Sequence, residues 1–212
     1  MKSIQNGQRR VVITGLGVVA PNGIGKENFW NACIAGRSGI RRITRFDASQ
    51  LPARIAGEVA NFDAEAVGLT EAEIHCMDRN TQFAVAAANL ALKDAALINV
   101  LTGEERNRTG VYMGSTMPSV EEFDNLFALA SRSTRLRDVL NNFISSALFM
   151  SNSPSAAIAA HHQLCGPSMV ISTGCAAGAD AIGEAFWSIQ EGRADLMLAG
   201  GTDAAISCGG IA

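Results

Sequence analysis

Short apolar runs alternate along this chain with stretches in which hydrophobic positions recur at helical spacing. The apolar runs predict strands and the intervening stretches predict helices, an alternation typical of a mostly parallel sheet with helices on its faces. The expected strands lie within 9–14, 108–113, 169–171 and 195–199. The expected helices cover 25–36, 70–97, 119–130, 152–162 and 176–189. The pattern therefore indicates the α/β class.

Some of these elements carry more specific expectations. The helix after Gly25 should turn Phe29, Trp30 and Ile34 inward. The long helix Thr70–Leu97 should begin at a capping box, because Glu73 follows Thr70 by three residues. Two alanine-rich segments, 83–96 and 156–161, predict buried helices that approach their neighbours closely, whereas 37–68 should be irregular.

Composition bounds what the chain can do. With 212 residues, 48% of them hydrophobic, residues 1–212 can bury a sizeable core as one domain, and no linker divides them. A net charge of −3 gives no reason to expect nucleic acid or an anionic membrane as partner. No apolar run reaches the length of a membrane span, and the N-terminus lacks the pattern of a secretory signal. Five widely spaced cysteines fit neither a disulfide framework nor a metal site, so we expect a cytoplasmic protein without a metal.

Cys175 is the strongest candidate for chemistry. It follows a short apolar strand and the turn-forming pair Thr173-Gly174, and it opens the helix that follows. Free N–H groups and the positive end of the helix dipole stabilise an anion at such a position, which favours a nucleophilic thiolate. The alternative is a small buried hydrophobic residue, as most free cysteines are.

A complete catalytic set does not accompany this cysteine. The three histidines are His75 in a polar helical stretch and His161 and His162 at the end of an alanine-rich helix. Neither His161 nor His162 is expected to act directly in catalysis. The carboxylates of Asp180, Glu184 and Asp203 have no evident partner in the sequence. The residues therefore supply a nucleophile without an acid–base group.

Two further patterns have weaker interpretations. Gly15-Leu-Gly-Val-Val-Ala20 matches the dinucleotide-binding fingerprint formally, but Pro21-Asn-Gly23 interrupts the helix that this fingerprint requires. The cluster of Arg41, Arg42 and Arg45 fits a solvated surface, or alternatively a contact with an acidic partner.

Several collinear motifs together resemble those of the β-ketoacyl-acyl-carrier-protein synthases, the condensing enzymes of fatty acid and polyketide synthesis. The motifs Ser-Thr-Gly-Cys and Gly-Gly-Thr-Asp resemble the ketosynthases of type II polyketide systems more than a housekeeping fatty acid enzyme. The matching segments are Arg10–Gly17, Pro21–Gly23, Gly36–Ile40, Phe46-Asp47, Met77–Arg79, Gln82–Ala84, Gly114-Ser115, Gly166-Pro167, Ser172–Cys175 and Ala199–Gly201.

The resemblance implies the N-terminal half of a thiolase-like fold, which is a duplicated αβαβα layered structure. It implies that Cys175 accepts an acyl group from the phosphopantetheine of an acyl carrier protein, with no other cofactor. The Cys175 N–H would form one side of an oxyanion hole. Met117 would line the acyl pocket, and the strand around Ser168–Ser172 would pair with a second subunit in a homodimer or heterodimer.

The departures from the family pattern are equally definite. Members are about twice this length, and their second half carries two catalytic histidines, a structural lysine and a Gly-Phe-Gly-Gly loop. We therefore expect the C-terminal half as a separate or missing chain, and this chain to be inactive without it. Ile74-His-Cys76 replaces the basic residues usual before Met77-Asp78. Two alternatives stay open, a non-catalytic chain-length-factor-like partner subunit and a thiolase-type acyltransferase.

Overall fold

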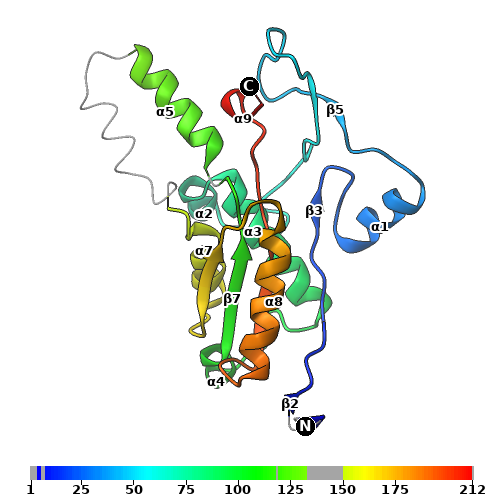
Figure 1. Cartoon of the computed structure of the whole chain (residues 1–212), viewed down its shortest axis with the longest axis vertical. Coiled ribbons are helices and arrows are strands. Elements are labelled where there is room, and N and C mark those ends of the chain that lie inside the picture. Colours follow the sequence, from blue (N-terminus) through cyan, green and yellow to red (C-terminus); the bar gives the residue numbers. More distant parts are fainter. Residues whose placement is uncertain (1–3, 6–7, 118, 133–149, 212) are drawn as a thin grey trace.

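The centre of the molecule is a three-stranded parallel sheet. The computed structural model describes residues 4–5, 8–117, 119–132 and 150–211. Strand β7 (Thr109–Gly114) lies between β8 (Ser168–Ile171) and β9 (Leu196–Gly201) (Figure 1). Val111 is opposite Ser168 on one side and Leu198 on the other. All six residues of β7 are buried, as expected for the middle strand of a parallel sheet covered on both faces. The three expected strands 108–113, 169–171 and 195–199 are thus confirmed to within two residues.

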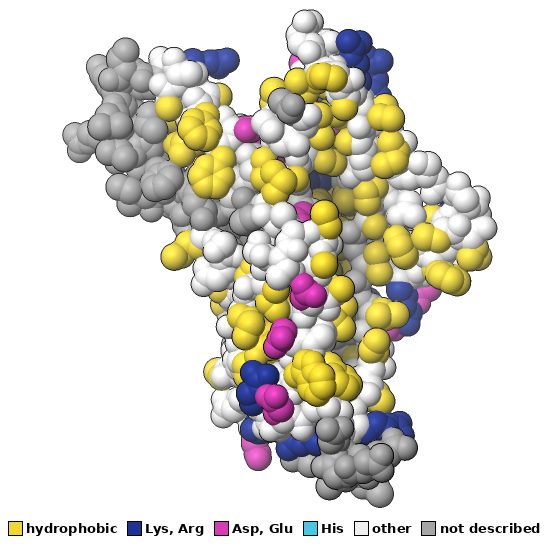
Figure 2. Space-filling view, in the orientation of Figure 1, with side chains coloured by type: hydrophobic (Ala, Val, Ile, Leu, Met, Phe, Trp, Pro, Cys, Tyr) yellow, Lys and Arg dark blue, Asp and Glu magenta, His cyan; other side chains and the backbone are white. Residues whose placement is uncertain are grey.

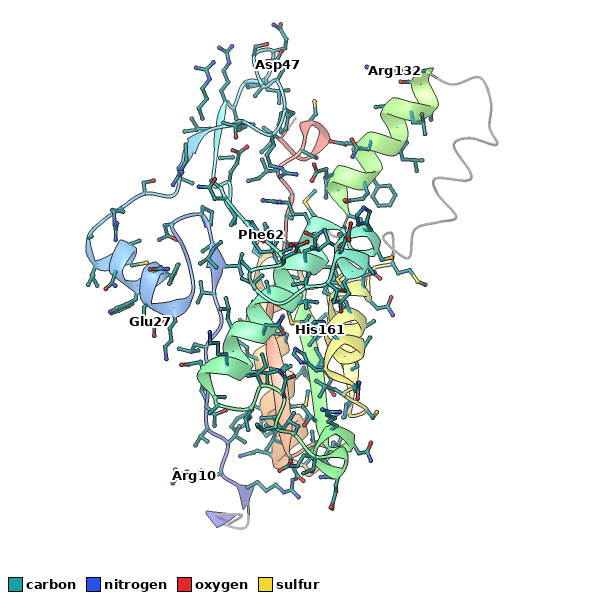
Figure 3. The ribbon with its side chains drawn as sticks, turned by 180° about the vertical axis from the view of Figure 1, so that it is seen from behind. Arg10, Glu27, Asp47, Phe62, Arg132 and His161 are labelled. Carbon is teal, nitrogen blue, oxygen red and sulfur yellow. The ribbon has the colours of Figure 1, made fainter. Side chains whose placement is uncertain are left out.

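Helices cover both faces of this sheet. Helix α8 (Ala177–Gln190) packs on the face that carries Tyr112, through Ala181 and Ala185. Helices α3 (Arg79–Asp94) and α7 (Ser153–His162) pack on the opposite face, against Val111 and Met113 (Figures 1 and 3). Alternation along β7 therefore divides the core into two layers, because successive side chains of a strand point to opposite faces.

The expected helix 70–97 is wrong in one respect, since it divides into two. Helix α2 (Glu71–Cys76) begins at the expected capping box of Thr70 and Glu73 and ends at Met77. The Asp78 side chain then accepts a hydrogen bond from the Thr81 N–H at 2.8 Å and starts α3. A side chain that binds a backbone N–H three residues later favours a new helix start over a continuous helix. The alanine-rich part of α3 is buried, as expected.

Of the strand expected within 9–14, Arg9 alone lies in a ladder. Residues 4–5 and 8–9 pair as the short strands β1 (Ile4–Gln5) and β2 (Gln8–Arg9), and β3 (Val19–Ala20) pairs with β4 (Gly23–Ile24). Between the two hairpins the chain lies on α3. A Cβ atom at Gly17 would be 1.8 Å from the Ala87 carbonyl oxygen, and one at Gly15 would be 2.2 Å from that of Ala91. These glycines permit close packing on a helix, which accounts for their spacing without a nucleotide.

Helix α1 (Lys26–Ile34) forms where expected, but its apolar residues do not all point inward. Trp30 is 63% exposed and Ile34 is 67% exposed, so that part of the expectation is wrong. Only Ala32 of this helix is buried. Helical spacing gives the period of a hydrophobic pattern but does not say which neighbour covers it.

The remaining described elements are short or peripheral. Segment 37–68 is largely irregular and contains the paired strands β5 (Arg41–Arg42) and β6 (Ile55–Ala56). Helix α4 (Gly103–Asn107) precedes β7, and α5 (Val120–Arg132) follows it, with α9 (Cys208–Ile211) beside α5. Among the residues that the structure describes, no helix has the length and apolar character needed to cross a bilayer.

Candidate functional site

Cys175 lies where β8 gives way to α8. A single 3-10 turn, η2 (Gly174–Ala176), joins the two elements, and Gly174 adopts the left-handed region at φ 73°. Glycine adopts this conformation without the steric penalty of a Cβ atom, so the residue before the cysteine suits the sharp turn. The strand–turn–helix position expected from the sequence is therefore present. Cys175 is exposed, so it is not a buried hydrophobic residue in this chain.

The thiol borders a hollow of about 260 Å³ at the carboxyl ends of the three parallel strands. Open α/β folds bind ligands at this edge of the sheet. The hollow is lined by Gly114, Thr116, Gly174, Cys175, Ala177, Gly178, Gly201, Thr202 and Asp203. All five cysteines of the chain are exposed, but only Cys175 lines this hollow, so exposure alone does not distinguish it.

Glycines let the start of α8 approach the strand ends. A Cβ atom at Gly114 would lie 2.2 Å from the Ala177 carbonyl carbon. One at Gly178 would lie 3.2 Å from the Gly201 Cα atom, whereas one at Gly183 would meet nothing within 4 Å. Close approach thus requires glycine at 114, and at 178 a larger residue would be in tight contact with Gly201. The small residues hold the helix N-terminus and its cysteine directly above the sheet edge.

Asp203 ties two strand ends together beneath the cysteine. Its carboxylate accepts hydrogen bonds from the Ser115 hydroxyl at 3.1 Å, the Thr116 N–H at 3.0 Å and the Met117 N–H at 2.9 Å. The sequence offered no partner for this carboxylate, because two of the three donors are backbone groups of a loop far away in the chain. In the local sequence, only the Gly200-Gly201 pair shortly before Asp203 indicated a turn at the end of a strand.

The same loop contacts the cysteine turn directly. The Thr116 hydroxyl donates to the Gly174 carbonyl oxygen at 2.9 Å. Behind it, the Asn80 amide donates to the Ser115 hydroxyl at 3.1 Å, and the Thr202 hydroxyl donates to the Asn80 carbonyl at 2.8 Å. The loops that follow β7 and β9, the cysteine turn that follows β8 and helix α3 are therefore joined by hydrogen bonds beside Cys175.

Met117 occupies the next position of this loop. Its backbone N–H binds Asp203, and its side chain is 42% exposed. It is not among the residues that line the Cys175 hollow in the described part of the chain. An acyl-pocket role for Met117 stays a prediction.

The histidines lie elsewhere. His161 and His162 border a separate hollow of about 100 Å³ beside α3. Figure 3 labels His161 on helix α7. The His161 Nδ1 atom is 2.5 Å from the Glu73 Oε1 atom. Partial burial acts to raise the Glu73 pKa, but hydrogen bonds from His161 and Thr70 outweigh it and hold that pKa below its usual range. Burial, together with the neighbouring His161, lowers the pKa of His162 to about 4. Neither ring lines the Cys175 hollow.

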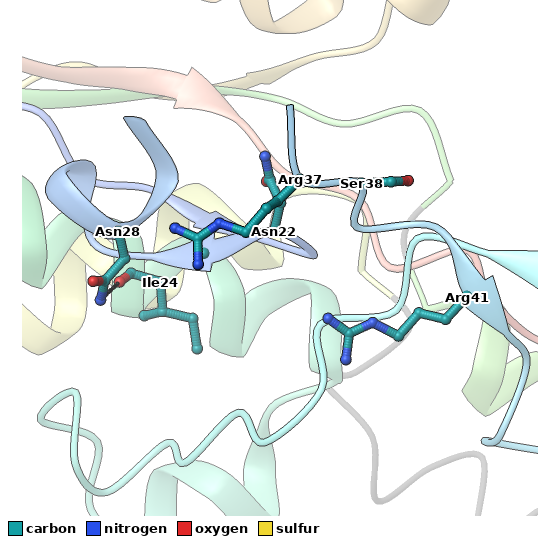
Figure 4. Close-up of a pocket in the computed structure, with 7 residues that line it drawn as sticks. Asn22, Ile24, Asn28, Arg37, Ser38 and Arg41 are labelled. Atoms are coloured by element: carbon teal, nitrogen blue, oxygen red, sulfur yellow. Dashed lines mark hydrogen bonds between the residues drawn. The ribbon is translucent and has the colours of Figure 1, made fainter. Parts of the chain in front are cut away.

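The Asp180 carboxylate and the expected arginine cluster lie at different places in the structure. The Asp180 carboxylate hydrogen-bonds the Thr173 hydroxyl, close to the cysteine turn. Arg45 pairs with Glu121 at 2.5 Å, so it does not form one cluster with Arg41 and Arg42. Arg41 instead borders an open hollow of about 540 Å³ together with Arg37 (Figure 4). In the described ranges, no three His, Cys, Asp or Glu side chains are grouped so as to hold a metal ion.

Comparison with known proteins places this geometry among relatives. A family model, the N-terminal domain of β-ketoacyl synthase, matches residues 8–212. A granaticin polyketide putative β-ketoacyl synthase 1 of Streptomyces violaceoruber is 41% identical over 203 residues, covering 94% of this chain and 47% of that protein. A 3-oxoacyl-[acyl-carrier-protein] synthase 2 of Synechocystis is 38% identical over 204 residues, covering the same shares.

A solved structure agrees with these matches. The ketosynthase AntDE, in complex with the type II polyketide acyl-carrier protein AntF, superposes with a TM-score of 0.76 at 29% identity. The match covers 96% of this chain and 48% of that one. The chain thus spans about half the length of the relatives that it matches.

Proposed function

Because the chain belongs to the β-ketoacyl synthase family through its N-terminal domain, we propose that it is the nucleophile-bearing half of a condensing enzyme. In this proposal Cys175 accepts the acyl group of an acyl carrier protein thioester. The acyl group then undergoes decarboxylative condensation with malonyl carrier protein, in fatty acid or polyketide synthesis. The observation that carries the proposal is the exposed thiol at a helix start, on the edge of a hollow formed by three strand ends.

The first step is a thioester exchange. The Cys175 sulfur attacks the thioester carbonyl, a tetrahedral oxyanion forms, and the bond to the carrier sulfur then breaks. The thiol proton of Cys175 ends on the departing phosphopantetheine thiol, so one thioester replaces another. The N–H groups at the start of α8 favour negative charge at this place. Met117, in the loop that follows β7, would contact the acyl chain.

The later step requires more than this chain. Condensation forms a carbon–carbon bond to the acyl carbonyl, releases carbon dioxide from the malonyl unit and returns the Cys175 thiol. The resemblance assigns decarboxylation to two histidines of the second half of the family sequence. His161 and His162 lie at a different hollow, so they do not substitute for that pair. We therefore propose that the complete reaction takes place in a unit that contains the second half.

Two partners fit this proposal. An acyl carrier protein is the donor, and the solved complex of AntDE with AntF supports it by its likeness to this chain. A second subunit would pair along β8, which forms one edge of the described three-stranded sheet and leaves Met169 39% exposed. An open strand edge is a template for pairing. Met169→Lys should then weaken the pairing along β8 and lower the native mass of the protein, and an unchanged mass would argue against this interface.

The acyl-transfer proposal is tested by intact mass. Incubation with an acyl carrier thioester should add one acyl group, and peptide mapping should place it on Cys175. Cys175→Ala should abolish the adduct, whereas Cys208→Ala, which removes another exposed cysteine, should keep it. An adduct that persists in Cys175→Ala would remove the proposal. Without the second half, the chain should not decarboxylate malonyl carrier protein.

Cys175 argues against the alternative of a chain-length-factor-like subunit. A chain-length-factor-like subunit would need no nucleophile, and such subunits typically replace the cysteine. The retained Cys175 and the network that surrounds it favour the condensing enzyme. A thiolase-type acyltransferase would instead exchange acyl groups with free coenzyme A, so an acyl-coenzyme A donor in the same assay distinguishes it.

A further inference from the structure

The peptide group between Gly174 and Cys175 has two ends that matter for acyl transfer. One end is the Cys175 N–H, the expected donor to the oxyanion, and the other is the Gly174 carbonyl. Because a trans peptide is planar, its N–H and C=O point in opposite directions, and fixing the oxygen also fixes the N–H. Gly174 has no Cβ atom and lies at φ 73°, so its own side chain does not restrain this plane.

The structure supplies that restraint from the loop that follows β7. The Thr116 hydroxyl donates to the Gly174 oxygen at 2.9 Å, and the Ala177 N–H donates to the same oxygen. The carbonyl thus accepts two hydrogen bonds, one from its own turn and one from the loop after β7. Only the Thr116 bond ties the peptide to the rest of the sheet.

We propose that Thr116 is a positioning residue that aims the Cys175 N–H at the transition-state oxyanion by holding the Gly174 carbonyl. This inference rests on the proposed function. Hydrogen bonds to a peptide oxygen also polarise the peptide and strengthen its N–H as a donor. A preorganised donor needs no rearrangement when the negative charge develops, and stabilisation of this kind is usually the largest single contribution to catalysis.

Thr116 is itself held in place. Its N–H donates to the Asp203 carboxylate at 3.0 Å, and the same carboxylate fixes the residues on either side, Ser115 and Met117. Threonine is β-branched, so its side chain has few rotamers, and the hydroxyl stays directed toward Gly174 once the backbone is fixed. Asp203 therefore acts on the cysteine turn through Thr116.

The test separates acylation from simple thiol reactivity. Attack of Cys175 on a carrier thioester builds an oxyanion, whereas alkylation by iodoacetamide does not. Thr116→Val keeps the side-chain shape but removes the hydroxyl. At saturating thioester, it should slow acylation of Cys175 about tenfold or more, the size of effect seen when a supporting hydrogen bond is lost. Alkylation of Cys175 should stay within about twofold of the wild-type rate.

Two further variants complete the design. Thr116→Ser restores the hydroxyl and should restore most of the acylation rate. Thr102→Val is the matched control, because it removes a threonine hydroxyl that caps α4 before β7 and should leave acylation unchanged. Equal acylation by Thr116→Val and wild type would overturn the inference alone, as would an equal loss of acylation and alkylation. Wild-type protein that accepts no acyl group would overturn the proposed function, and the inference with it.

Discussion

At the scale of single residues, His162 shows how burial determines ionisation. The ring contacts that of His161, with 4.7 Å between the ring centroids, and its buried Nε2 atom has no hydrogen-bond partner among the described residues. Burial and the adjacent His161 lower its pKa to about 4, against 6.5 for an ordinary histidine. Between these two values the unfolded chain binds a proton that the folded chain excludes. The contribution of neutral His162 to the stability of the fold is therefore fully present above pH 6.5 and declines as the pH falls toward 4.

Acidification from pH 7 to pH 5 should consequently lower the free energy of unfolding by about 1 kcal/mol, after allowance for partial solvent screening. The pKa of Glu73 is held below its ordinary value, and comparison with a variant that lacks the His162 ring assigns the change to this histidine. Urea titrations at both pH values measure the change. His162→Leu should remove most of it, whereas His75→Leu, a change at an exposed histidine, should keep it. A full pH response in His162→Leu would contradict the assignment.

The role of a site residue could be predicted from the sequence only where the segments that define its surroundings are contiguous in the chain. Cys175 was identified because its strand, turn and helix are contiguous. Asp203 was seen as a carboxylate without a partner, since the backbone donors at Thr116 and Met117 reach it only after β7 and β9 pair. The hydrogen bond from the Thr116 hydroxyl to Gly174 likewise forms only after β7 and β8 pair, so the local sequence pattern does not predict it.

At the scale of elements, the N-terminal segment depends on glycine for its packing on α3. Gly17→Ala would place a methyl group 1.8 Å from the Ala87 carbonyl oxygen, so the segment or the helix must move. We expect a loss of about 2 kcal/mol of stability, typical of overpacking. Gly183→Ala in α8 is the control, because its new methyl group meets nothing within 4 Å and should raise stability by up to about 1 kcal/mol. Urea midpoints that shift equally would contradict this packing.

Asp78 joins two helices and is 2% exposed. It caps α3 through Thr81 and also accepts hydrogen bonds from the Ser119 N–H at 2.9 Å and hydroxyl at 3.0 Å, before α5. Asp78→Ala removes these three buried hydrogen bonds and should cost about 3 kcal/mol. Thr102→Ala, at the exposed cap of α4, should cost only about 1 kcal/mol. Chemical denaturation of both variants measures the difference, and similar losses would exclude this role of Asp78.

Elements were predicted well where the pattern contained its own boundary. The strands of the sheet lie between turn residues, and the capping box of Thr70 fixed the start of α2. The division at Asp78 was missed because Asp78 receives its second set of partners from Ser119, more than forty residues away. The exposed faces of α1 and α8 were not predictable, since a period does not reveal which side a neighbour covers.

At the scale of the molecule, the fold is the N-terminal half of the thiolase-like arrangement, and several large apolar side chains are exposed on it. Helix α8 buries small residues, Ala177, Ala181 and Ala185, against the sheet. Its larger apolar side chains point away, with Ile182 51% and Trp187 50% exposed. Figure 2 shows hydrophobic side chains spread over this face of the molecule. Exposed apolar patches favour association.

We therefore expect purified protein to self-associate through this face. The double change Ile182→Gln and Trp187→Gln should weaken the association at least about tenfold, because large apolar side chains dominate such contacts. Sedimentation over a range of concentrations measures it. Val100→Gln, a change at a 61% exposed position outside α8, should have no effect. Unchanged association in the double variant would direct attention to the exposed residues around Val12 instead.

The central position of β7 has a consequence for synthesis on the ribosome. Both strands that pair with β7 follow it in the sequence, and the second is complete only at Gly201. The nascent chain therefore displays the apolar strand Thr109–Gly114 while β8, α8 and β9 are still being translated. The fully buried middle strand of the finished sheet thus lacks its second paired strand until Gly201 has been added, which makes it a target for chaperones that bind emerging chains.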